Sequence, residues 1–243
     1  MKGFIILGLS VSSVLSAQTD STQIKEIQEV SFTRRLPVSK EIINVQKDLG
    51  SKNLGQDLPI LLKNQMSVVA TSDAGNGVGY TGFRIRGSAG TSINVMLNGV
   101  PYNDSESQGT FFVNIPDMAS SASQIVIQRG VGTSSNGTAS FGASVNILTK
   151  NPDEKPYVLG QFSAGSFNTL KTSFEAGSGK FLNNLLSVSA RYSTINSDGY
   201  IDRAFSKLNS YSINALFEKG NTKIRFLTFG GKEKTYQAWN GID

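Results

Sequence analysis

Two residue types are missing from this chain of 243 residues, which has no cysteine and no histidine. Without cysteine there are no disulfide bonds and no thiol nucleophile, and without histidine the commonest transition-metal ligand and the usual general base are absent. An enzyme made from this chain would have to work through carboxylates, lysine, serine or tyrosine. The composition therefore predicts no metal site and no cofactor.

Charge is also sparse, because charged residues make up only 17% of the chain, with a formal net charge of +5. The lysines and arginines are dispersed and are not interleaved with aromatic residues, so we expect no nucleic-acid partner. Asp104 and Glu106 would be the acids of an exported carboxylate-based hydrolase, but such charges in a loop are more often solvated. We predict no catalytic residues and no enzymatic activity.

Long apolar runs are missing too, apart from one near the N-terminus. Residues 4–15 (FIILGLSVSSVL) follow the basic start Met1-Lys2 and end before Ser16-Ala17-Gln18. A basic start, a short apolar stretch and a small residue at the junction are typical of a secretory signal peptide, which we place at residues 1–17. A buried strand is the alternative, and no run approaches the ~20 apolar residues of a membrane helix. The sequence predicts an exported protein.

Glycine, by contrast, is abundant, and several glycines gather between Arg129 and Lys150. Gly132 and Gly137 have the spacing of a phosphate-binding P-loop, but Thr138 stands where that loop needs lysine. The dinucleotide fingerprint G-x-G-x-x-G is broken at Ser135. The stretch therefore favours a turn-rich structural role over a nucleotide site.

Residues 37–152 mix helical and strand patterns and predict a small α+β domain. A helix capped by Asn53 is expected up to Lys63, and Asn98-Gly99 is a strong turn signal. A second short helix is expected at Pro116–Ser123. The predicted strands are Phe83–Arg86, Ile93–Leu97, Gln124–Gln128 and Ser144–Leu148.

The pattern changes after Asn151-Pro152, because five segments then alternate apolar and polar residues with period two. The alternation fits the sandwich of a secreted domain and also a transmembrane barrel, whose apolar face meets lipid. Export, the absence of cysteine and tyrosines near strand ends favour the barrel. We expect turns at Gly177–Gly179 and Gly220-Asn221 and a loop at Asn196–Lys207. The predicted strands are Tyr157–Ala164, Thr169–Ala176, Leu185–Ile195, Tyr211–Glu218 and Thr222–Phe229.

Five segments in order resemble the N-terminal part of TonB-dependent outer-membrane receptors, a family with a plug domain inside a 22-stranded barrel. They are Ile27–Thr33 (IQEVSFT, similar to the Ton box), Phe83–Gly87 (FRIRG), Ile93–Pro101 (INVMLNGVP), Ile125–Gly130 (IVIQRG) and Phe141–Lys150 (FGASVNILTK). Asn98 stands where the family usually has Asp, Gln128 replaces an acidic or apolar residue, and Ser31 interrupts the Ton box. The resemblance implies an α+β plug followed by antiparallel strands of an incomplete transmembrane β-barrel.

The same resemblance implies a division of the chain into four parts. Residues 1–17 would be the signal peptide, 18–36 a periplasmic tether with the Ton box, 37–152 the plug domain and 153–243 about the first five barrel strands. A barrel of 22 strands at about ten residues each needs more than ~220 residues, so we expect this chain to be a fragment of a longer receptor or the product of a truncated gene.

The resemblance also implies roles for particular residues. Arg86 and Arg129 match plug arginines that pair with carboxylates of the barrel wall, and the alternative is that they are ordinary solvated arginines. The ligand would meet the apex loops Ser72–Thr81 and Tyr102–Phe112, unless their phenylalanines pack inside. The Ton box residues, which would bind the periplasmic TonB protein by strand addition, are Ile27, Gln28, Glu29, Val30, Ser31, Phe32 and Thr33. The predicted apex contacts are Tyr80, Tyr102, Phe111 and Phe112.

The function implied is active uptake of a scarce nutrient across the outer membrane. The partners would be TonB, outer-membrane lipid and a small-molecule ligand. Because the short tether has no room for an N-terminal accessory domain, we expect a small metal chelate such as a ferric siderophore, although vitamins and oligosaccharides are also carried by this family. The alternative is a secreted β-rich binding or adhesion module.

Overall fold

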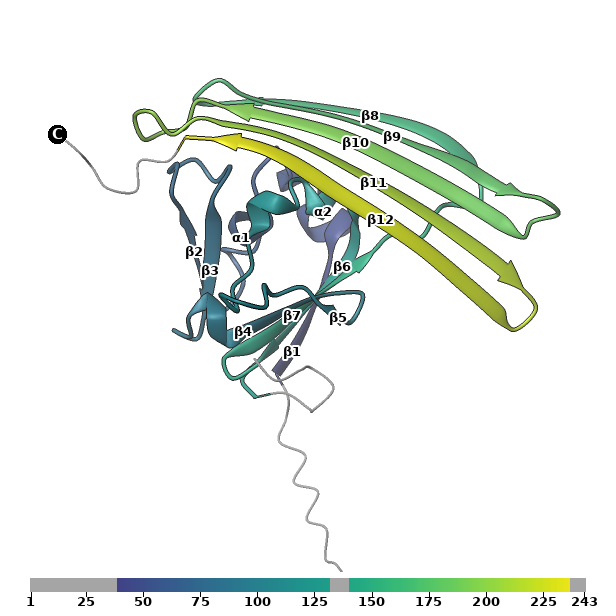
Figure 1. Ribbon diagram of the computed structural model, residues 1–243, viewed down its shortest axis with the longest axis horizontal. Helices are drawn as coiled ribbons and strands as arrows, with labels where there is room; N and C mark the ends of the chain where they lie inside the picture. The colour runs from purple at the N-terminus through teal and green to yellow at the C-terminus, as the bar shows by residue number, and fades with distance from the viewer. Residues whose placement is uncertain (1–38, 132–139, 237–243) are drawn as a thin grey trace, which may run out of the picture. The chain divides into compact units, whose positions relative to one another are not determined.

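The computed structural model describes residues 39–131 and 140–236, which lie in one compact unit of the chain, residues 37–243 (Figure 1). The predicted signal peptide (residues 1–17) and the Ton box (residues 27–33) lie outside the described residues, as does part of the glycine-rich stretch.

The N-terminal region, residues 39–149, is built on a five-stranded sheet in the order β1-β6-β7-β4-β5. β4 and β7 pair in parallel, and the other neighbours are antiparallel. A hairpin, β2–β3, forms a second, two-stranded sheet. The strands are β1 (Ser39–Asn44), β2 (Val68–Ser72), β3 (Thr81–Ile85), β4 (Ile93–Leu97), β5 (Val100–Pro101), β6 (Ala122–Arg129) and β7 (Ala143–Thr149).

Short helical segments connect these strands. The α-helices are α1 (Leu58–Leu61) and α2 (Met118–Ser121), and the other segments are η1 (Val45–Leu49), η2 (Gly50–Lys52), η3 (Gly90–Ser92) and η4 (Phe112–Asn114). The apolar side chains of the sheet and of these segments form the core. Its most deeply buried members are Ile93, Ala122, Ile125, Ile127, Ala143 and Val145. Because each is fully removed from water, this core contributes the main hydrophobic stabilisation of the region.

A second sheet, which we call the strand wall, holds β8 to β12 in sequential antiparallel order. Its strands are β8 (Pro156–Gly165), β9 (Thr169–Phe181), β10 (Leu186–Ser197), β11 (Ser206–Lys219) and β12 (Thr222–Thr235). The wall buries its polar face: Ser193 of β10 is 1% exposed, while the adjacent Tyr192 is 52% exposed. None of the helices that the structure describes has the length and hydropathy needed to cross a membrane.

The fold class predicted from the sequence is confirmed, since a mixed sheet with short helices is followed by antiparallel strands that do not close. The four strands predicted in the N-terminal region overlap β3, β4, β6 and β7, and the five predicted in the second part overlap β8 to β12. The turn at Gly220-Asn221 is also confirmed, between β11 and β12.

The turn predicted at Gly177–Gly179 is wrong, because these residues lie inside β9. The register between β9 and β10 shifts here, so that β9 carries one extra residue. Gly179 has a φ of +68°, and Ser178 Oγ accepts a hydrogen bond of 3.0 Å from Val188 N. The glycines therefore accommodate a β-bulge, and the chain turns instead at residues 182–185.

The helix predicted from Asn53 to Lys63 is also wrong at its start. α1 begins at Leu58, with Asp57 as the N-cap residue and Pro59 in the first turn. Proline is tolerated in the first turn because its missing N–H would have no partner there. The side chain of Asn53 is engaged elsewhere, as described below.

Candidate functional site

The N-terminal region and the strand wall meet around one buried carboxylate, that of Asp117. Asp117 precedes α2 and has a left-handed backbone with φ of 55°, which aspartate tolerates better than most residues. Its side chain is fully buried. A buried charge is costly unless it is paired and hydrogen-bonded, so its surroundings decide whether it can stay ionised.

The wall supplies two cations to this carboxylate. Lys171 Nζ of β9 lies 2.7 Å from Asp117 Oδ1, and Arg191 Nη1 of β10 lies 2.9 Å from Oδ2. Ser193 Oγ of β10 also donates to Oδ2, at 2.8 Å. Residues 171, 191 and 193 all lie on the inner face of the wall, since in the β9–β10 register Lys171 pairs with Ile195 and Ser193 with Ser173.

The N-terminal region completes the hydrogen bonding of this cluster. Ser120 Oγ donates to Asp117 Oδ1 at 2.5 Å. Lys171 Nζ reaches Ser120 Oγ at 3.1 Å and Asn53 Oδ1 at 3.2 Å. The lysine therefore has three acceptors for its three protons. We call Asn53, Asp117, Ser120, Lys171, Arg191 and Ser193 the Asp117 cluster.

The Asp117 cluster favours the ionised carboxylate. Burial by itself would raise the pKa of Asp117, but the positive charges of Arg191 and Lys171, with hydrogen bonds from Lys171 and Ser120, outweigh it and hold that pKa below its ordinary value. Removing the one acid of such a buried network leaves uncompensated charge, which typically costs about 3–5 kcal/mol. The cluster therefore links the two sheets through paired charges.

A second contact ties the end of β7 to the wall. Arg225 Nη2 of β12 donates to the carbonyl oxygen of Lys150 at 2.5 Å and to Thr149 Oγ1 at 2.6 Å. The hydroxyl groups of Ser121 on α2 and Ser212 on β11 lie 3.1 Å apart. These contacts fix the segment that leads from the first sheet into the wall.

A second buried acid, Asp57, connects α1 to the loop at Ser72–Thr81. Its backbone N donates to Gly77 O at 2.9 Å, and Thr81 Oγ1 donates to Asp57 Oδ2 at 3.0 Å. Its other oxygen, Oδ1, has no hydrogen-bond partner among the described residues. Burial raises the pKa of Asp57 to about 7, against the lowering effect of the Thr81 hydrogen bond.

The loop at Ser72–Thr81, predicted to face the ligand, is held by the wall. Ala74 O accepts hydrogen bonds from Tyr200 N at 2.8 Å and from Ile201 N at 3.2 Å, both in the loop between β10 and β11. Tyr80 is half-buried, and its hydroxyl donates to Glu233 Oε1 at 3.4 Å. This loop and the loop of residues 198–205 therefore form one surface.

The other predicted apex contacts, Tyr102, Phe111 and Phe112, differ in how deeply they are buried. Tyr102 packs against Phe229 of β12, with ring centroids 6.2 Å apart, and Phe111 is exposed. Phe112 is only 4% exposed and packs against Phe83 with ring centroids 5.4 Å apart. Phe112 is thus a core residue and not a surface contact.

The two predicted lock arginines have different surroundings. Arg129 at the end of β6 is buried and forms a salt bridge with Glu41 of β1, and its Nε donates to Met66 O at 3.0 Å. Arg86 is exposed and has φ of 52°. The pairing of these arginines with carboxylates of a barrel wall stays a prediction.

Asp104 shapes its own loop. Its Oδ2 accepts hydrogen bonds from Ser107 N at 2.7 Å and from Ser107 Oγ at 2.8 Å, which lower the pKa of Asp104. Glu106 N also donates to it, at 3.2 Å. A carboxylate occupied in this way, on an exposed loop, gives the hydrolase alternative no support.

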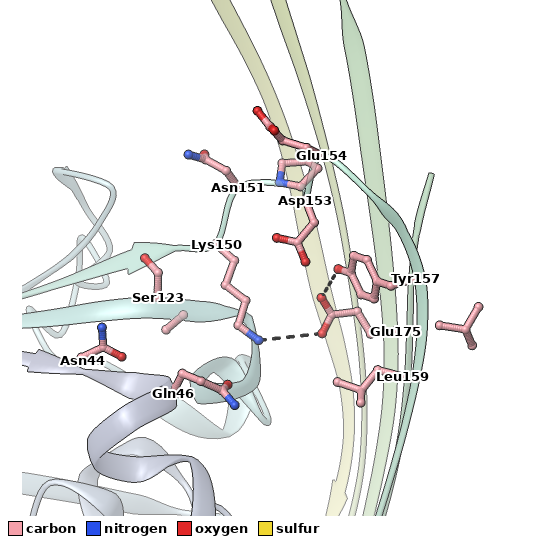
Figure 2. Close-up of a pocket in the computed structure, with 13 residues that line it drawn as sticks. Asn44, Gln46, Ser123, Lys150, Asn151, Asp153, Glu154, Tyr157, Leu159 and Glu175 are labelled. Carbon is pink, nitrogen blue, oxygen red and sulfur yellow. Dashed lines mark hydrogen bonds and ion pairs between the residues drawn. The ribbon is translucent and has the colours of Figure 1, made fainter. Parts of the chain in front are cut away.

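A cavity of about 740 Å³ lies where the chain passes from β7 to β8 (Figure 2). Tyr157 of β8 donates its hydroxyl to Glu175 Oε1 at 2.6 Å, and Lys150 Nζ lies 3.9 Å from Glu175 Oε2. Figure 2 shows these three side chains converging between the N-terminal region and the wall. Among the described residues, no group of three or more acidic side chains could hold a metal ion there or elsewhere.

Sequence reasoning missed the Asp117 cluster, although a signal for it exists. Lys171 and Arg191 occupy positions on the polar face of wall strands where most neighbours are serine or threonine. A single charge on such a face needs a counter-charge. Asp117 supplies it, and in the sequence this residue follows Pro116, at the predicted start of a helix. The sequence could not show that these positions meet.

The chain resembles known proteins by sequence in its N-terminal region and by fold over most of its length. The family model described as "TonB-dependent Receptor Plug Domain" matches residues 33–144. Among solved structures, the chain is similar to the ferripyoverdine receptor of the outer membrane of Pseudomonas aeruginosa, with a TM-score of 0.67 and 15% identity over 83% of this chain and 26% of that one. It is also similar to the copper transporter OprC (TM-score 0.67, 14% identity, 82% of this chain and 32% of that one).

A third similar structure is the siderophore receptor PirA from Acinetobacter baumannii, with a TM-score of 0.62 and 16% identity over 81% of this chain and 32% of that one. No curated protein matches the chain by sequence. The chain spans about a third or less of the length of these solved receptors. At such low identity, the likeness shows the fold.

Proposed function

We propose that residues 33–144, which match the model of the TonB-dependent receptor plug domain, form such a plug, and that the protein acts in the outer membrane as the N-terminal portion of a transporter for a scarce nutrient. The family is one of receptors and not of enzymes. From here on, the N-terminal region is called the plug.

The main support for this proposal is the orientation of the strand wall, which turns its polar face inward and its apolar face outward. The plug covers much of the wall's polar inner face, including Lys171, Ser193 and Ser210, and the wall's outer face presents large apolar side chains such as Phe174, Tyr192 and Phe226. An apolar outer face is unfavourable in water and favourable in lipid. A secreted adhesion module in water would place these same side chains inside.

TonB is the partner that the tether would meet. Residues 27–33 resemble the Ton box, and the chain enters the plug through the edge strand β1 soon after. A segment rich in residues that favour strands, such as Val30 and Phe32, suits recognition by strand addition. Movement imposed on the tether would reach β1 first and then Arg129, whose salt bridge with Glu41 holds β1 to β6.

The substrate is a small metal chelate, most simply a ferric siderophore. Two of the similar receptors are named for siderophores and the third for copper. In this chain the ligand would meet the surface formed by loops 72–81 and 198–205, together with Tyr102 and Phe111. Arg86 and Arg129 would contribute to the plug's contact with barrel strands that follow the described ones.

A proline in the Ton box tests the proposal in the full-length product of the gene. Val30→Pro removes a backbone donor and should abolish uptake of the ferric siderophore while leaving its binding to whole cells intact. Thr22→Pro, in the polar stretch before the Ton box, is the matched control and should transport normally. Normal uptake by Val30→Pro would refute coupling through this segment. Recovery of the protein in the soluble fraction would support the secreted module instead.

A further inference from the structure

The outer face of the strand wall carries charge of one sign only. In the register of β8 to β12, the acidic side chains Glu175, Glu218 and Glu233 all fall on the inner face. Within these described strands, the charged side chains on the outer face are Lys207, Lys219, Lys232 and Lys234. The face therefore has no acidic group of its own to neutralise them.

Three of these lysines form a cluster on β11 and β12, which lie side by side (Figure 1). Lys207 and Lys234 are directly opposite in the antiparallel register, and Lys232 is opposite Asn209 on the same face. Like charges directly opposite are destabilising, because their Cβ atoms are only about 4.5–5.5 Å apart. All three are exposed, and none has an ion pair among the described residues.

The depth of the cluster follows from the geometry of β11. Lys207 and Lys219 lie on one face of this strand, and at about 3.4 Å per residue they are about 41 Å apart along it. With a tilt of about 40°, the separation along the membrane normal is about 31 Å, close to the roughly 30 Å thickness of the hydrocarbon core. The residues between them on this face include Tyr211, Ile213 and Phe217. The lysines therefore bracket the apolar band at the level of lipid headgroups.

The two ends of the wall differ in their connections. The Lys219 end has the tight turn at Gly220-Asn221, while the cluster end has the longer loop of residues 198–205. Outer-membrane barrels place short turns on the periplasmic side and longer loops outside. On the proposed function, on which this inference rests, the three-lysine cluster faces the outer leaflet.

We propose that Lys207, Lys232 and Lys234 bind the phosphate groups of an anionic lipid headgroup in the outer leaflet. Each ammonium group can snorkel from the strand to the interface and donate to phosphate oxygens. A bound phosphate offsets the repulsion between Lys207 and Lys234, which the wall itself leaves uncompensated. The site anchors the β11–β12 hairpin at a defined depth in the membrane.

The test uses the full-length protein in phosphatidylcholine vesicles that carry trace spin-labelled phosphatidic acid, whose headgroup is a phosphate monoester, or spin-labelled phosphatidylcholine. The immobilised fraction in the electron paramagnetic resonance spectrum measures association with the protein. The triple variant K207Q/K232Q/K234Q should lower association of phosphatidic acid by about fivefold per lysine, or roughly 100-fold, and leave phosphatidylcholine unchanged.

The matched control is K47Q/K52Q/K63Q, which removes the same charge from exposed plug lysines and should bind phosphatidic acid like the wild type. K207R/K232R/K234R should retain binding. Unchanged binding by the triple glutamine variant, or an equal loss in the control, overturns the site. Displacement of the labelled lipid by an equal concentration of inorganic phosphate also overturns it. A protein that inserts into neither vesicle refutes the proposed function itself.

Discussion

The plug sheet and the strand wall use the same two-residue alternation but bury opposite kinds of side chain. In β6, Ile127 is fully buried, and in β10, Ser193 is buried while Tyr192 is exposed. An alternation with period two shows that the two faces of a sheet differ in polarity. It does not show which of the two faces is buried. The environment on each side decides that, and on the proposed function this environment is lipid at the outer face of the wall.

The Asp117 cluster lies at the interface between the plug and the strand wall. The plug contributes the acid and the wall contributes the two cations, so the interface depends on charge where the plug interior depends on apolar packing. Changes in each part should therefore have different consequences.

Removing the acid of the cluster should have the largest effect. Asp117→Asn leaves Lys171 and Arg191 buried without a counter-charge and should lower the free energy of unfolding by about 3–5 kcal/mol, measured by denaturant titration of the full-length protein in detergent. Asp202→Asn, in the exposed loop between β10 and β11, is the control and should leave the unfolding midpoint unchanged. The triple change D117N/K171M/R191M should recover most of the loss. No recovery would mean that Asp117 acts through local backbone structure.

Cavity formation in the plug comes next. Ile127→Ala should lower the free energy of unfolding by about 3 kcal/mol, because the space left behind in the sheet core cannot be refilled. Ile213→Ala on the outer face of the wall removes the same atoms from a partly exposed site and should cost less than half as much. Equal losses in the two variants would contradict the placement of Ile127 in a closed core and of Ile213 on an open face.

Introducing a charge on the outer face of the wall should show whether that face lies in lipid or in water. Ile213→Arg lies midway between Lys207 and Lys219 and should cost about 2–4 kcal/mol when unfolding is measured from lipid vesicles. Gln161→Arg, on the exposed inner face of β8, is the matched change and should be close to neutral. If both variants are neutral, then the outer face of the wall lies in water.

The smallest effect concerns pH, to which the two buried acids should respond in opposite senses. The pKa of Asp57 is raised to about 7, so its stabilising neutral form is lost as pH rises toward and through that value. The pKa of Asp117 is lowered, so its contribution is lost only in acid, below the ordinary aspartate range. Asp57→Asn should therefore raise stability at pH 8 by about 1–2 kcal/mol and leave it nearly unchanged at pH 4. A loss of stability at pH 8 would show that Asp57 is ionised and paired there.

The sequence predicted the wall strands well because their alternation is local. It did not predict β1, whose SKEIIN segment mixes charged and apolar residues and becomes a strand by pairing with β6. The turn at Gly177–Gly179 was misplaced because glycine serves a bulge as readily as a turn. In both cases the local conformation depends on pairing with a neighbouring strand, which the local sequence does not show.

The candidate site was less accessible from the sequence than the fold. Phe112 was predicted as a surface contact because its segment is a loop, but it packs against Phe83 in the core. Asp117, Lys171 and Arg191 are far apart in sequence, and only the register of β9 and β10 brings the two cations to one place. The Ton box lies outside the described residues, so its role stays a prediction.

The contact between Ser121 and Ser212 gives the chain a practical property. Their hydroxyl oxygens are 3.1 Å apart, one on the plug and one on the wall, and the chain has no cysteine. Replacing both serines by cysteine would therefore place the sole pair of thiols in the sequence at facing positions on the plug and the wall. Oxidation could then cross-link the plug to the wall and reduction release it, which would show whether uptake requires the two to separate.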